Sequence, residues 1–233
     1  MDVRLTRVAQ ALTLLRPLRV VALGQVGYEE AWALQREAAE SVKAGGTETL
    51  FLLEHAPVFT LGRNADARDI LFSPEARRER SIALVESDRG GRATYHGPGQ
   101  LVGYPVLSLS PGRRDVKRYV TDLEEVLLRT LADFGILAAR SGLRERVSSL
   151  WVGNDKIAAL GIHISRWVTT HGFALNVTNE PLANFSGIVP CGITDGGVTT
   201  MERVLGRHVS VREVADRIPA HFADVFSREI IGG

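Results

Sequence analysis

The chain has 233 residues, of which 45% are apolar and 24% charged, so it can bury the core of one large domain. Lys and Arg number 28 against 27 Asp and Glu, without a basic block, which argues against a dedicated nucleic-acid-binding protein. The single cysteine excludes an internal disulfide framework and a cysteine-cluster metal site, and no apolar run approaches membrane-spanning length.

The domain organisation follows from the same composition. Residues 1–17 contain a short apolar stretch without a small-residue cleavage site, so we interpret them as an extension and not as a signal peptide. We expect residues 18–233 to form one domain, because no repeat or low-complexity linker divides them. A free thiol persists in a reducing compartment, and we therefore expect a cytoplasmic protein.

The first half of the domain alternates short strands with helices. An amphipathic pattern predicts a helix over Tyr28–Lys43, closed by Gly45 and Gly46, and a short helix is predicted over residues 74–80. Apolar runs predict strands over residues 17–23, 49–54, 58–61 and 82–86.

Two further helices are marked by apolar residues at helical spacing. Asp115 is a candidate N-cap of the first and Gly135 its stop, while Ser210 and Glu213 have capping-box spacing at the start of the second. The apolar positions are Val116, Tyr119, Val120, Leu123, Val126, Leu127 and Leu131 in the first helix and Val211, Val214, Ala215, Ile218, Phe222 and Val225 in the second.

The stretch between these two helices is rich in strands. Residues 149–152, 153–155 and 156–165 indicate a strand, a turn and a strand, and residues 168–177 can pair back as an antiparallel strand. Because strands run together here, an α+β fold is favoured over a doubly wound parallel sheet.

The densest cluster of chemically informative residues is RGGRATYHGPGQ, residues 89–100. Its glycines allow the backbone to approach a ligand closely, and Thr94, Tyr95 and His96 add polar side chains. The run has neither the GK[ST] ending of a P-loop nor GxGxxG spacing. A plain glycine-rich hairpin connection explains its composition equally well.

Two later segments could line a ligand site. Lys156 stands at a turn edge before an apolar run, a position where an isolated lysine is usually solvated. The segment HGFALN, residues 171–176, is small and apolar enough to line a slot for a hydrocarbon chain, and it suits a core strand equally well.

Cys191 lies between Pro190 and Gly192, which place it in a rigid turn. A lone cysteine is most often a small buried hydrophobic residue. It becomes a nucleophile when a nearby cation populates its thiolate, and Lys156 is the cation that we nominate. Their separation of 35 positions in the sequence leaves their distance in space open.

Taken in order, RGGRATYHGPGQLVGYPVL, DKIAALGI, HGFALNV and PCGI resemble the lipoyl(octanoyl) transferase family over residues 18–226. The resemblance implies a single α+β domain with a mixed, largely antiparallel sheet flanked by helices, like the catalytic domain of biotin and lipoate protein ligases. It also implies an acyltransferase that moves octanoyl from octanoyl-acyl carrier protein to a specific lysine of lipoyl domains, the first step of endogenous protein lipoylation.

The resemblance implies a role for individual residues. Cys191 would carry the acyl group as a thioester, and Lys156 would lower the pKa of its thiol. The residues implied to surround the acyl chain and its thioester are Arg89, Gly90, Gly91, Arg92, Ala93, Thr94, Tyr95, His96, Ala159, Leu160, Gly161, Gly172, Phe173 and Ala174.

The implied acceptors are lipoyl domains of 2-oxoacid dehydrogenase E2 subunits and the glycine cleavage H protein. No cofactor is implied, because the thioester donor is already activated and needs no ATP. We also expect a monomer with no metal, no nucleic acid and no membrane partner. His96 and His171 lack a third partner at metal-ligand spacing and fit polar, pocket-lining roles better.

Three other functions remain open. An ATP-dependent lipoate or biotin ligase would share the glycine-rich loop and the lysine, although the HGPGQL and PCGI pair argues against it. An amidotransferase acting between lipoyl domains would also use a cysteine. A non-catalytic module would bind lipoyl domains or acyl chains without turnover. A Ser-His-Asp hydrolase is improbable because GxSxG is absent.

Overall fold

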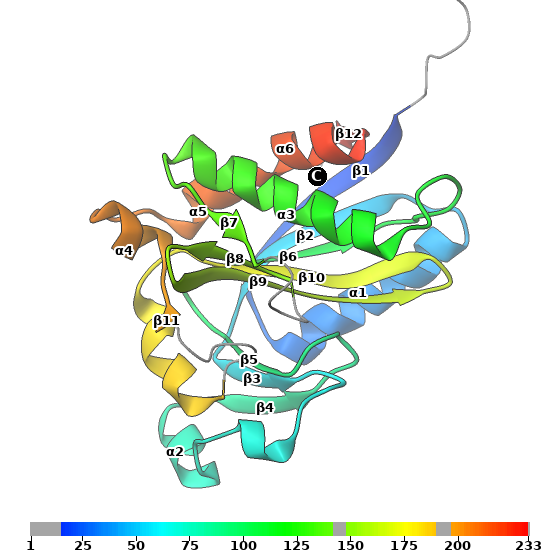
Figure 1. The fold of residues 1–233 in the computed structure, drawn as a ribbon. Helices are drawn as coiled ribbons and strands as arrows, with labels where there is room; N and C mark the ends of the chain where they lie inside the picture. Colours follow the sequence, from blue (N-terminus) through cyan, green and yellow to red (C-terminus); the bar gives the residue numbers. More distant parts are fainter. Residues whose placement is uncertain (1–14, 142–147, 190–196, 233) are drawn as a thin grey trace, which may run out of the picture.

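The protein is built on two sheets of unequal size, with helices packed on both faces of the larger one (Figure 1). The structure, a computed structural model, describes residues 15–141, 148–189 and 197–232. Within these residues, the large sheet has nine strands and the small sheet has three. This arrangement confirms the α+β fold expected from the clustered strands.

The large sheet is mixed and largely antiparallel. Its strands run in the order β12-β1-β2-β6-β10-β9-β8-β7, and β11 pairs with β9 off this path. The pairs β12–β1, β1–β2 and β11–β9 are parallel, and the other neighbours are antiparallel. The strands are β1 (Arg16–Val26), β2 (Glu48–His55), β6 (Gln100–Val106), β7 (Ala139–Arg140), β8 (Ser149–Val152), β9 (Asp155–Ser165), β10 (Val168–Asn176), β11 (Gly197–Val198) and β12 (Arg228–Ile231).

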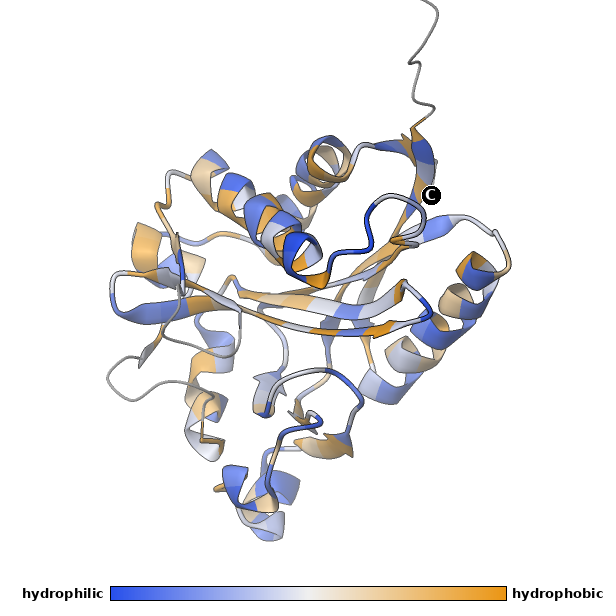
Figure 2. Ribbon diagram, turned by 45° about the vertical axis from the view of Figure 1, so that its right-hand side comes forward, coloured by the Kyte–Doolittle hydropathy of each residue, from blue (hydrophilic) through white to orange (hydrophobic). Residues whose placement is uncertain are grey.

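One face of the large sheet carries α3 (Val116–Asp133), α5 (Val211–Ala215) and α6 (Ile218–Phe226). The Asp115 side chain caps α3 by accepting from the Arg118 N–H, as its position predicted. Apolar stripes of α3, α5 and α6 pack with the inward side chains of the sheet into the main core. Figure 2 shows the polar residues of these helices turned away from the sheet.

The opposite face carries α1 (Tyr28–Lys43) and, beside it, the small sheet. The buried positions of α1 recur at helical spacing and meet a second, smaller core on this face. The small sheet has the order β4-β3-β5, with β3 (Val58–Leu61) between β4 (Ala83–Glu86) and β5 (Ala93–His96). Its own core contains Phe59 and Tyr95.

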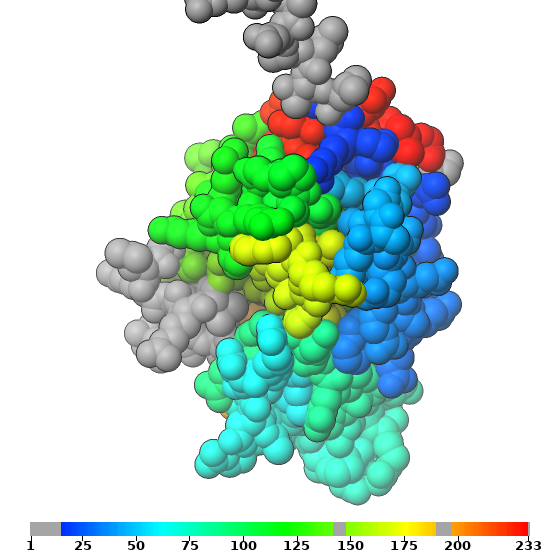
Figure 3. Space-filling model, turned by 90° about the vertical axis from the view of Figure 1, so that its right-hand side faces the viewer, coloured from blue at the N-terminus to red at the C-terminus, as the bar shows by residue number. Residues whose placement is uncertain are grey.

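Shorter elements complete the described chain. They are α2 (Pro74–Glu79), α4 (Met201–Leu205) and the 3₁₀ helices η1 (Ala67–Asp69) and η3 (Glu180–Gly187). The turn between β9 and β10 reaches the surface between the α3 and α1 sides, as the yellow band of Figure 3 shows. There Arg166 donates to the carboxylate of Glu40 on α1 across 3.2 Å. No helix in the described part of the chain is both long and apolar enough to cross a membrane.

One predicted helix was wrong in its extent. The apolar stripe from Val211 to Val225 lies on two helices, α5 and α6, and not on a single one. Pro219 falls in the first turn of α6, where it has no N–H to donate and its ring would clash with the carbonyl of Ala215 in a continuous helix. The capping box of Ser210 and Glu213 is confirmed at the start of α5.

Candidate active site

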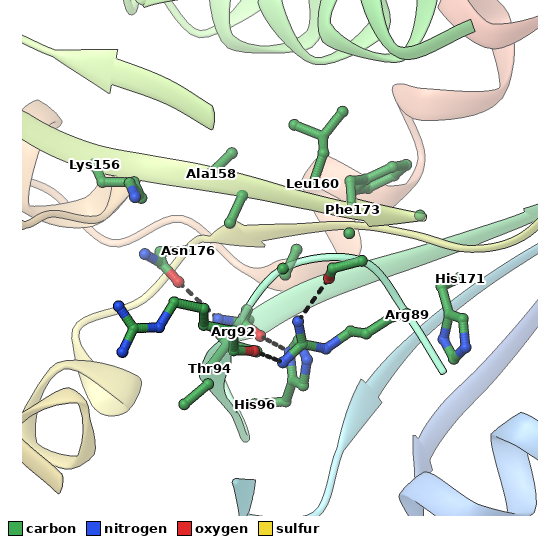
Figure 4. A pocket seen from close by; sticks show the side chains of 18 of the residues that line it. Arg89, Arg92, Thr94, His96, Lys156, Ala158, Leu160, His171, Phe173 and Asn176 are labelled. Atoms are coloured by element: carbon green, nitrogen blue, oxygen red, sulfur yellow. Dashed lines mark hydrogen bonds between the residues drawn. The ribbon is translucent and has the colours of Figure 1, made fainter. Parts of the chain in front are cut away.

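A pocket lies between the large sheet and the glycine-rich segment that leads into β5 (Figure 4). Strands β9 and β10 form one wall, and residues 89–96 form the other. All but one of the expected site residues that lie in the described part of the chain line this pocket. They are Lys156, Arg89, Gly90, Gly91, Arg92, Ala93, Thr94, His96, Ala159, Leu160, Gly161, Gly172, Phe173 and Ala174.

The exception is Tyr95. Its ring packs against Phe59 and Phe185 in the core of the small sheet, and its hydroxyl accepts from the Asn184 amide across 2.9 Å. The reason is the alternation of side chains along β5, which turns Thr94 and His96 to the pocket and Tyr95 away from it.

Arg89 shapes the glycine-rich wall through its buried guanidinium. The side chain is 7% exposed, and it donates to the carbonyl oxygens of Thr60 and Arg92 across 2.7 Å each and to that of Gly90 across 3.0 Å. A guanidinium offers five donors in a rigid fork, so one side chain can fix several backbone groups at once. Arg89 therefore holds the loop in shape.

Arg92 is fixed from the other side by a carboxylate. Its Nε lies 3.1 Å from Oδ2 of Asp69, and its Nη2 also donates to that carboxylate. The Asp69 side chain is only 3% exposed, whereas Arg92 is 46% exposed and lines the pocket. This geometry presents a positive charge at the pocket while the anion that orients it stays buried.

Glycines allow backbones to approach closely, both between the two walls and within the large sheet. Gly161 of β9 and Gly172 of β10 are paired across the strands. A Cβ on Gly172 would clash with the carbonyl oxygen of Gly103 in β6, and one on Gly161 would lie 3.0 Å from the carbonyl oxygen of Gly90. The Gly90 N–H donates to the carbonyl of Ile162 across 2.9 Å. A side chain on Gly161 would hold the loop off the sheet, and one on Gly172 would force β10 away from β6.

A hydrogen-bonded chain of side chains crosses the floor of the pocket. His96 Nδ1 lies 2.6 Å from Gln100 Oε1, Gln100 Nε2 donates to Asn176 Oδ1 across 2.9 Å, and Asn176 Nδ2 donates to the Thr199 carbonyl across 3.1 Å. Because Gln100 Oε1 can only accept, His96 carries its proton on Nδ1. Burial and the neighbouring His55 and Arg89 hold the pKa of His96 well below its usual value, so the ring is neutral at neutral pH.

Lys156 lies in β9 with only 9% of its surface exposed, which contradicts the alternative of a solvated turn lysine. Its ammonium stands 4.9 Å from the ring centroid of Trp151, a cation–π distance. Its carbonyl accepts from the Thr199 N–H across 2.9 Å, and β11 pairs in parallel with this part of β9. The buried cation is thereby fixed at one end of the pocket (Figure 4).

A cluster of aromatic and imidazole rings lies near the other end of the pocket. Tyr104 lines the pocket, and its hydroxyl donates to Nε2 of His55 across 2.7 Å. Burial lowers the pKa of His55 to about 4 and raises that of Tyr104 well above 10, so both groups are neutral. His171 Nε2 lies 2.7 Å from Oδ1 of Asp88, yet burial lowers the pKa of His171 as well.

Cys191, with Pro190 and Gly192, lies outside the described residues. Ile188 and Val198, which flank it in the sequence, both line the pocket. Sequence reasoning named neither of them, nor did it name Gln100, Tyr104 and Asn176 as site residues. Reading residues 100–106 as a strand would have placed Gln100 and Tyr104 on one face through their even spacing. Within the described ranges, no group of three or more His, Asp or Glu side chains is arranged to hold a metal ion.

Comparison with solved structures defines the class of fold. A lipoate protein ligase from Thermoplasma acidophilum matches 94% of this chain over 86% of its own length, with a TM-score of 0.72 and 18% identity. A lipoate-protein ligase A bound with ATP gives a TM-score of 0.74 at 17% identity, over 94% of this chain and 90% of that one. A biotin protein ligase from Aquifex aeolicus gives 0.54 at 13% identity, over 90% and 70%. The domain therefore has the catalytic-domain fold of lipoate and biotin protein ligases.

Sequence relatives narrow this class. The lipoyl protein ligase A/B catalytic domain family matches residues 27–223. Proteins named octanoyltransferase from Caldicellulosiruptor bescii and Solibacter usitatus are 45% and 46% identical over 91% of this chain, which spans 93% and 94% of their lengths. The chain belongs to the lipoyl(octanoyl) transferase family and is an acyltransferase.

Proposed function

We propose that this acyltransferase moves an octanoyl group from octanoyl-acyl carrier protein to a lysine of lipoyl domains through a thioester on Cys191. The observation that carries the proposal is a buried cation, Lys156, at one end of a pocket whose middle is lined by small and apolar residues. The name shared by the relatives supports octanoyl as the acyl group.

The first step exchanges one thioester for another. The Cys191 thiolate attacks the carbonyl carbon of the octanoyl thioester, the bond from that carbon to the carrier's sulfur breaks, and the carrier leaves with a free thiol after taking up a proton. Bond types are conserved, so the acyl-enzyme has an energy similar to that of the donor. A covalent intermediate divides one difficult transfer into two easier ones.

The second step makes an amide. The amine of the acceptor lysine attacks the Cys191 thioester, the carbon–sulfur bond breaks, and the thiolate of Cys191 returns. Conversion of a thioester to an amide drives the sequence forward. Lys156 as an ammonium stabilises the thiolate and then gives its proton to the departing carrier thiolate in the first step. The neutral Lys156 takes a proton from the attacking amine in the second step. The backbone N–H groups of Cys191 and Gly192 are the proposed donors to the oxyanion.

Described residues on both sides of Cys191 support its place in this scheme. Cys191 follows Ile188 by three residues, and a chain advances at most about 3.6 Å per residue. Val198, seven residues later, pairs with Lys156 in the β11–β9 ladder. Ile188 and Val198 thus both lie at the pocket, and Val198 lies beside the buried lysine.

The acceptors that we propose are lipoyl domains of 2-oxoacid dehydrogenase E2 subunits and the glycine cleavage H protein, acted on by a cytoplasmic monomer. The T. acidophilum ligase of similar fold was characterised together with its E2 lipoyl domain, which supports a lipoyl domain as the acceptor. Residues 1–17 are proposed to be an extension, whose last two residues already belong to β1, and residues 18–233 the catalytic domain.

Mass spectrometry tests the mechanism directly. Incubation with octanoyl-acyl carrier protein should add one octanoyl group to the enzyme, on Cys191, and addition of a lipoyl domain should move it to the acceptor. Cys191→Ala and Lys156→Ala should each lose transfer by a factor of at least about 10³. The chain has three lysines, so Lys117→Ala on α3 is a matched control that should keep full activity.

Two outcomes would contradict the proposal. Normal transfer by Cys191→Ala would exclude the covalent route. A requirement for ATP and free octanoic acid would favour the ligase chemistry of the proteins that share this fold. Competition between octanoyl-carrier protein and an octanoylated lipoyl domain as donors separates the proposed activity from an amidotransferase.

A further inference from the structure

His171 adopts a backbone conformation that is rare within a strand. Its φ is +55°, although it lies inside β10 and carries a Cβ. Successive side chains of a strand point to opposite faces, and those of Phe173 and Leu175 pack into the core on the α3 face. His171 shares their odd spacing, yet its ring contacts Tyr28 and Trp32 of α1 on the other face. The left-handed φ therefore turns the imidazole onto the pocket face.

The turned ring is held rigidly. It is 1% exposed, its Nε2 donates to Oδ1 of Asp88 across 2.7 Å, and it stacks on Tyr28 with an interplanar angle of 15°. Its backbone N–H donates to the Gln35 side chain of α1 across 2.7 Å. One hydrogen bond and one stack hold the ring, and a further hydrogen bond holds its backbone, so a ligand can displace the ring only by breaking these contacts.

The arrangement also costs stability. A left-handed residue with a side chain is strained, and Nδ1 of His171 is buried without a hydrogen-bond partner among the described residues. Features that raise the free energy of the folded state and persist at a pocket indicate a functional role for the position of the group. His171 lines the pocket at the end remote from Lys156 (Figure 4).

The separation between Lys156 and His171 suits an eight-carbon chain. His171 pairs with Ile162, six residues beyond Lys156 on β9, which corresponds to roughly 20 Å along the strand. An octanoyl chain has seven C–C bonds of about 1.5 Å and extends about 10 Å. The remaining length accommodates the lysine stem and the thioester. Between the two ends lie Ala159, Gly161 and Ala174, which are small enough to leave room for methylene groups.

We propose that His171 sets the upper limit of acyl-chain length, by closing the pocket with a fixed polar ring where the terminal methyl of an eight-carbon chain arrives. The proposal rests on the octanoyl transfer proposed above, since it assigns the residue that limits the length of the transferred acyl chain. A longer chain would have to displace the ring from Asp88 and Tyr28.

The test compares chain-length profiles of the wild type and His171→Gly. Glycine adopts the left-handed backbone without strain, so this variant removes the ring and keeps the strand geometry. We expect kcat/KM for decanoyl relative to octanoyl carrier protein to rise about tenfold, the effect of burying two more methylene groups. Asp88→Ala, at a half-exposed position, removes the acceptor that holds the ring and should give a smaller shift in the same direction.

His163→Ala is the matched control. Its imidazole also faces Asp88, with Nε2 3.8 Å from Oδ2, but His163 does not line the pocket, so the chain-length ratio should stay unchanged. An unchanged ratio in both folded His171→Gly and Asp88→Ala, or an equal loss of activity for hexanoyl, octanoyl and decanoyl donors, would overturn the proposal. Circular dichroism and urea unfolding establish that each variant is folded.

Direct binding separates this proposal from the proposed function. Calorimetry with octanoic and decanoic acid measures chain-length preference without any transfer step. Absence of octanoyl transfer by the wild type, together with a preference for octanoic acid that shifts toward decanoic acid in His171→Gly, would reject the function and retain the role of His171. Normal octanoyl transfer by the wild type, together with a fatty-acid preference that His171→Gly leaves unchanged, would retain the function and reject the role of His171.

Discussion

Gln100 and Asn176 are joined by a hydrogen bond of 2.9 Å from Nε2 to Oδ1, the middle link of the side-chain path from His96 to the Thr199 carbonyl. The bond ties β6 to β10 beneath the pocket. Because Thr199 also donates to the Lys156 carbonyl, the path ends at the strand that carries the buried cation. The polar floor and the lysine are therefore parts of one connected arrangement.

Breaking this path at Asn176 should affect both stability and transfer. Asn176→Asp keeps the shape and the acceptor for Gln100 but has no N–H for the Thr199 carbonyl, and it buries a charge. We expect unfolding free energy to fall by about 2 to 3 kcal/mol in urea titrations, with a clear loss of kcat/KM. Asn184→Asp, which removes the donor to the Tyr95 hydroxyl outside the pocket, should leave transfer intact.

Two ion pairs of this protein should differ strongly in how much they stabilise the fold. Asp69→Asn removes a carboxylate that is 3% exposed and holds Arg92 at the pocket, so we expect a loss of about 1 to 3 kcal/mol and a raised KM for the acyl donor. Glu75→Gln breaks an exposed pair with Arg78 and should change stability by less than about 0.5 kcal/mol. If both variants lost similar amounts of unfolding free energy, burial of Asp69 would not explain the strength of its pair with Arg92.

The contact between Gly172 and Gly103 leaves no room for a side chain. Gly172→Ala should force β10 away from β6, lower the unfolding free energy by about 2 kcal/mol or more and reduce acyl transfer. Gly232→Ala is the control, because a Cβ there meets nothing within 4 Å. Thermal unfolding monitored by circular dichroism measures both, and a near-neutral Gly172→Ala would contradict the close approach of the strands.

Stability should fall with acidification because His55 is buried as a neutral ring. Its pKa is about 4 in the folded protein against 6.5 when solvated, so the unfolded chain binds more protons between these values. Stability contributed by the neutral ring is complete above pH 6.5 and is lost as pH falls toward 4, by about 2 to 3 kcal/mol.

His55→Gln should flatten this dependence whatever its effect at pH 7. Urea titrations between pH 7 and 4.5 give the slope of unfolding free energy against pH for both proteins. Equal slopes would show that other groups, such as His96 and His171, dominate the acid sensitivity.

The residue pattern predicted the elements whose signals are local. Helix α1 was predicted with its observed bounds, since its buried positions keep helical spacing and glycines follow its end. Strand β6 was not predicted, because Gly103 and Pro105 are unfavourable in a strand and only the neighbouring β2 and β10 make that conformation stable. The split between α5 and α6 depends on Pro219, which the apolar spacing alone does not reveal.

In the site, too, some features could be predicted from the sequence and others depend on the folded structure. The resemblance of four short segments indicated most of the pocket residues, and the pairing of β9 with β10 explains why Ala159–Gly161 and Gly172–Ala174 meet. Alternation along β5 accounts for Tyr95 once the strand is known. The position of His171 is different in kind, because a left-handed residue reverses the alternation that any strand pattern assumes. The pattern of apolar and polar residues along β10 therefore does not predict which face His171 occupies.

The backbone of His171 connects α1 to the pocket in one further respect. The His171 N–H donates to the Gln35 side chain of α1 across 2.7 Å, so this amide of β10 is tied to the helix. Amide hydrogen exchange at this position therefore requires separation of the helix from the sheet, and not opening of the sheet itself. A single amide thus reports how often α1 lifts from the wall of the pocket.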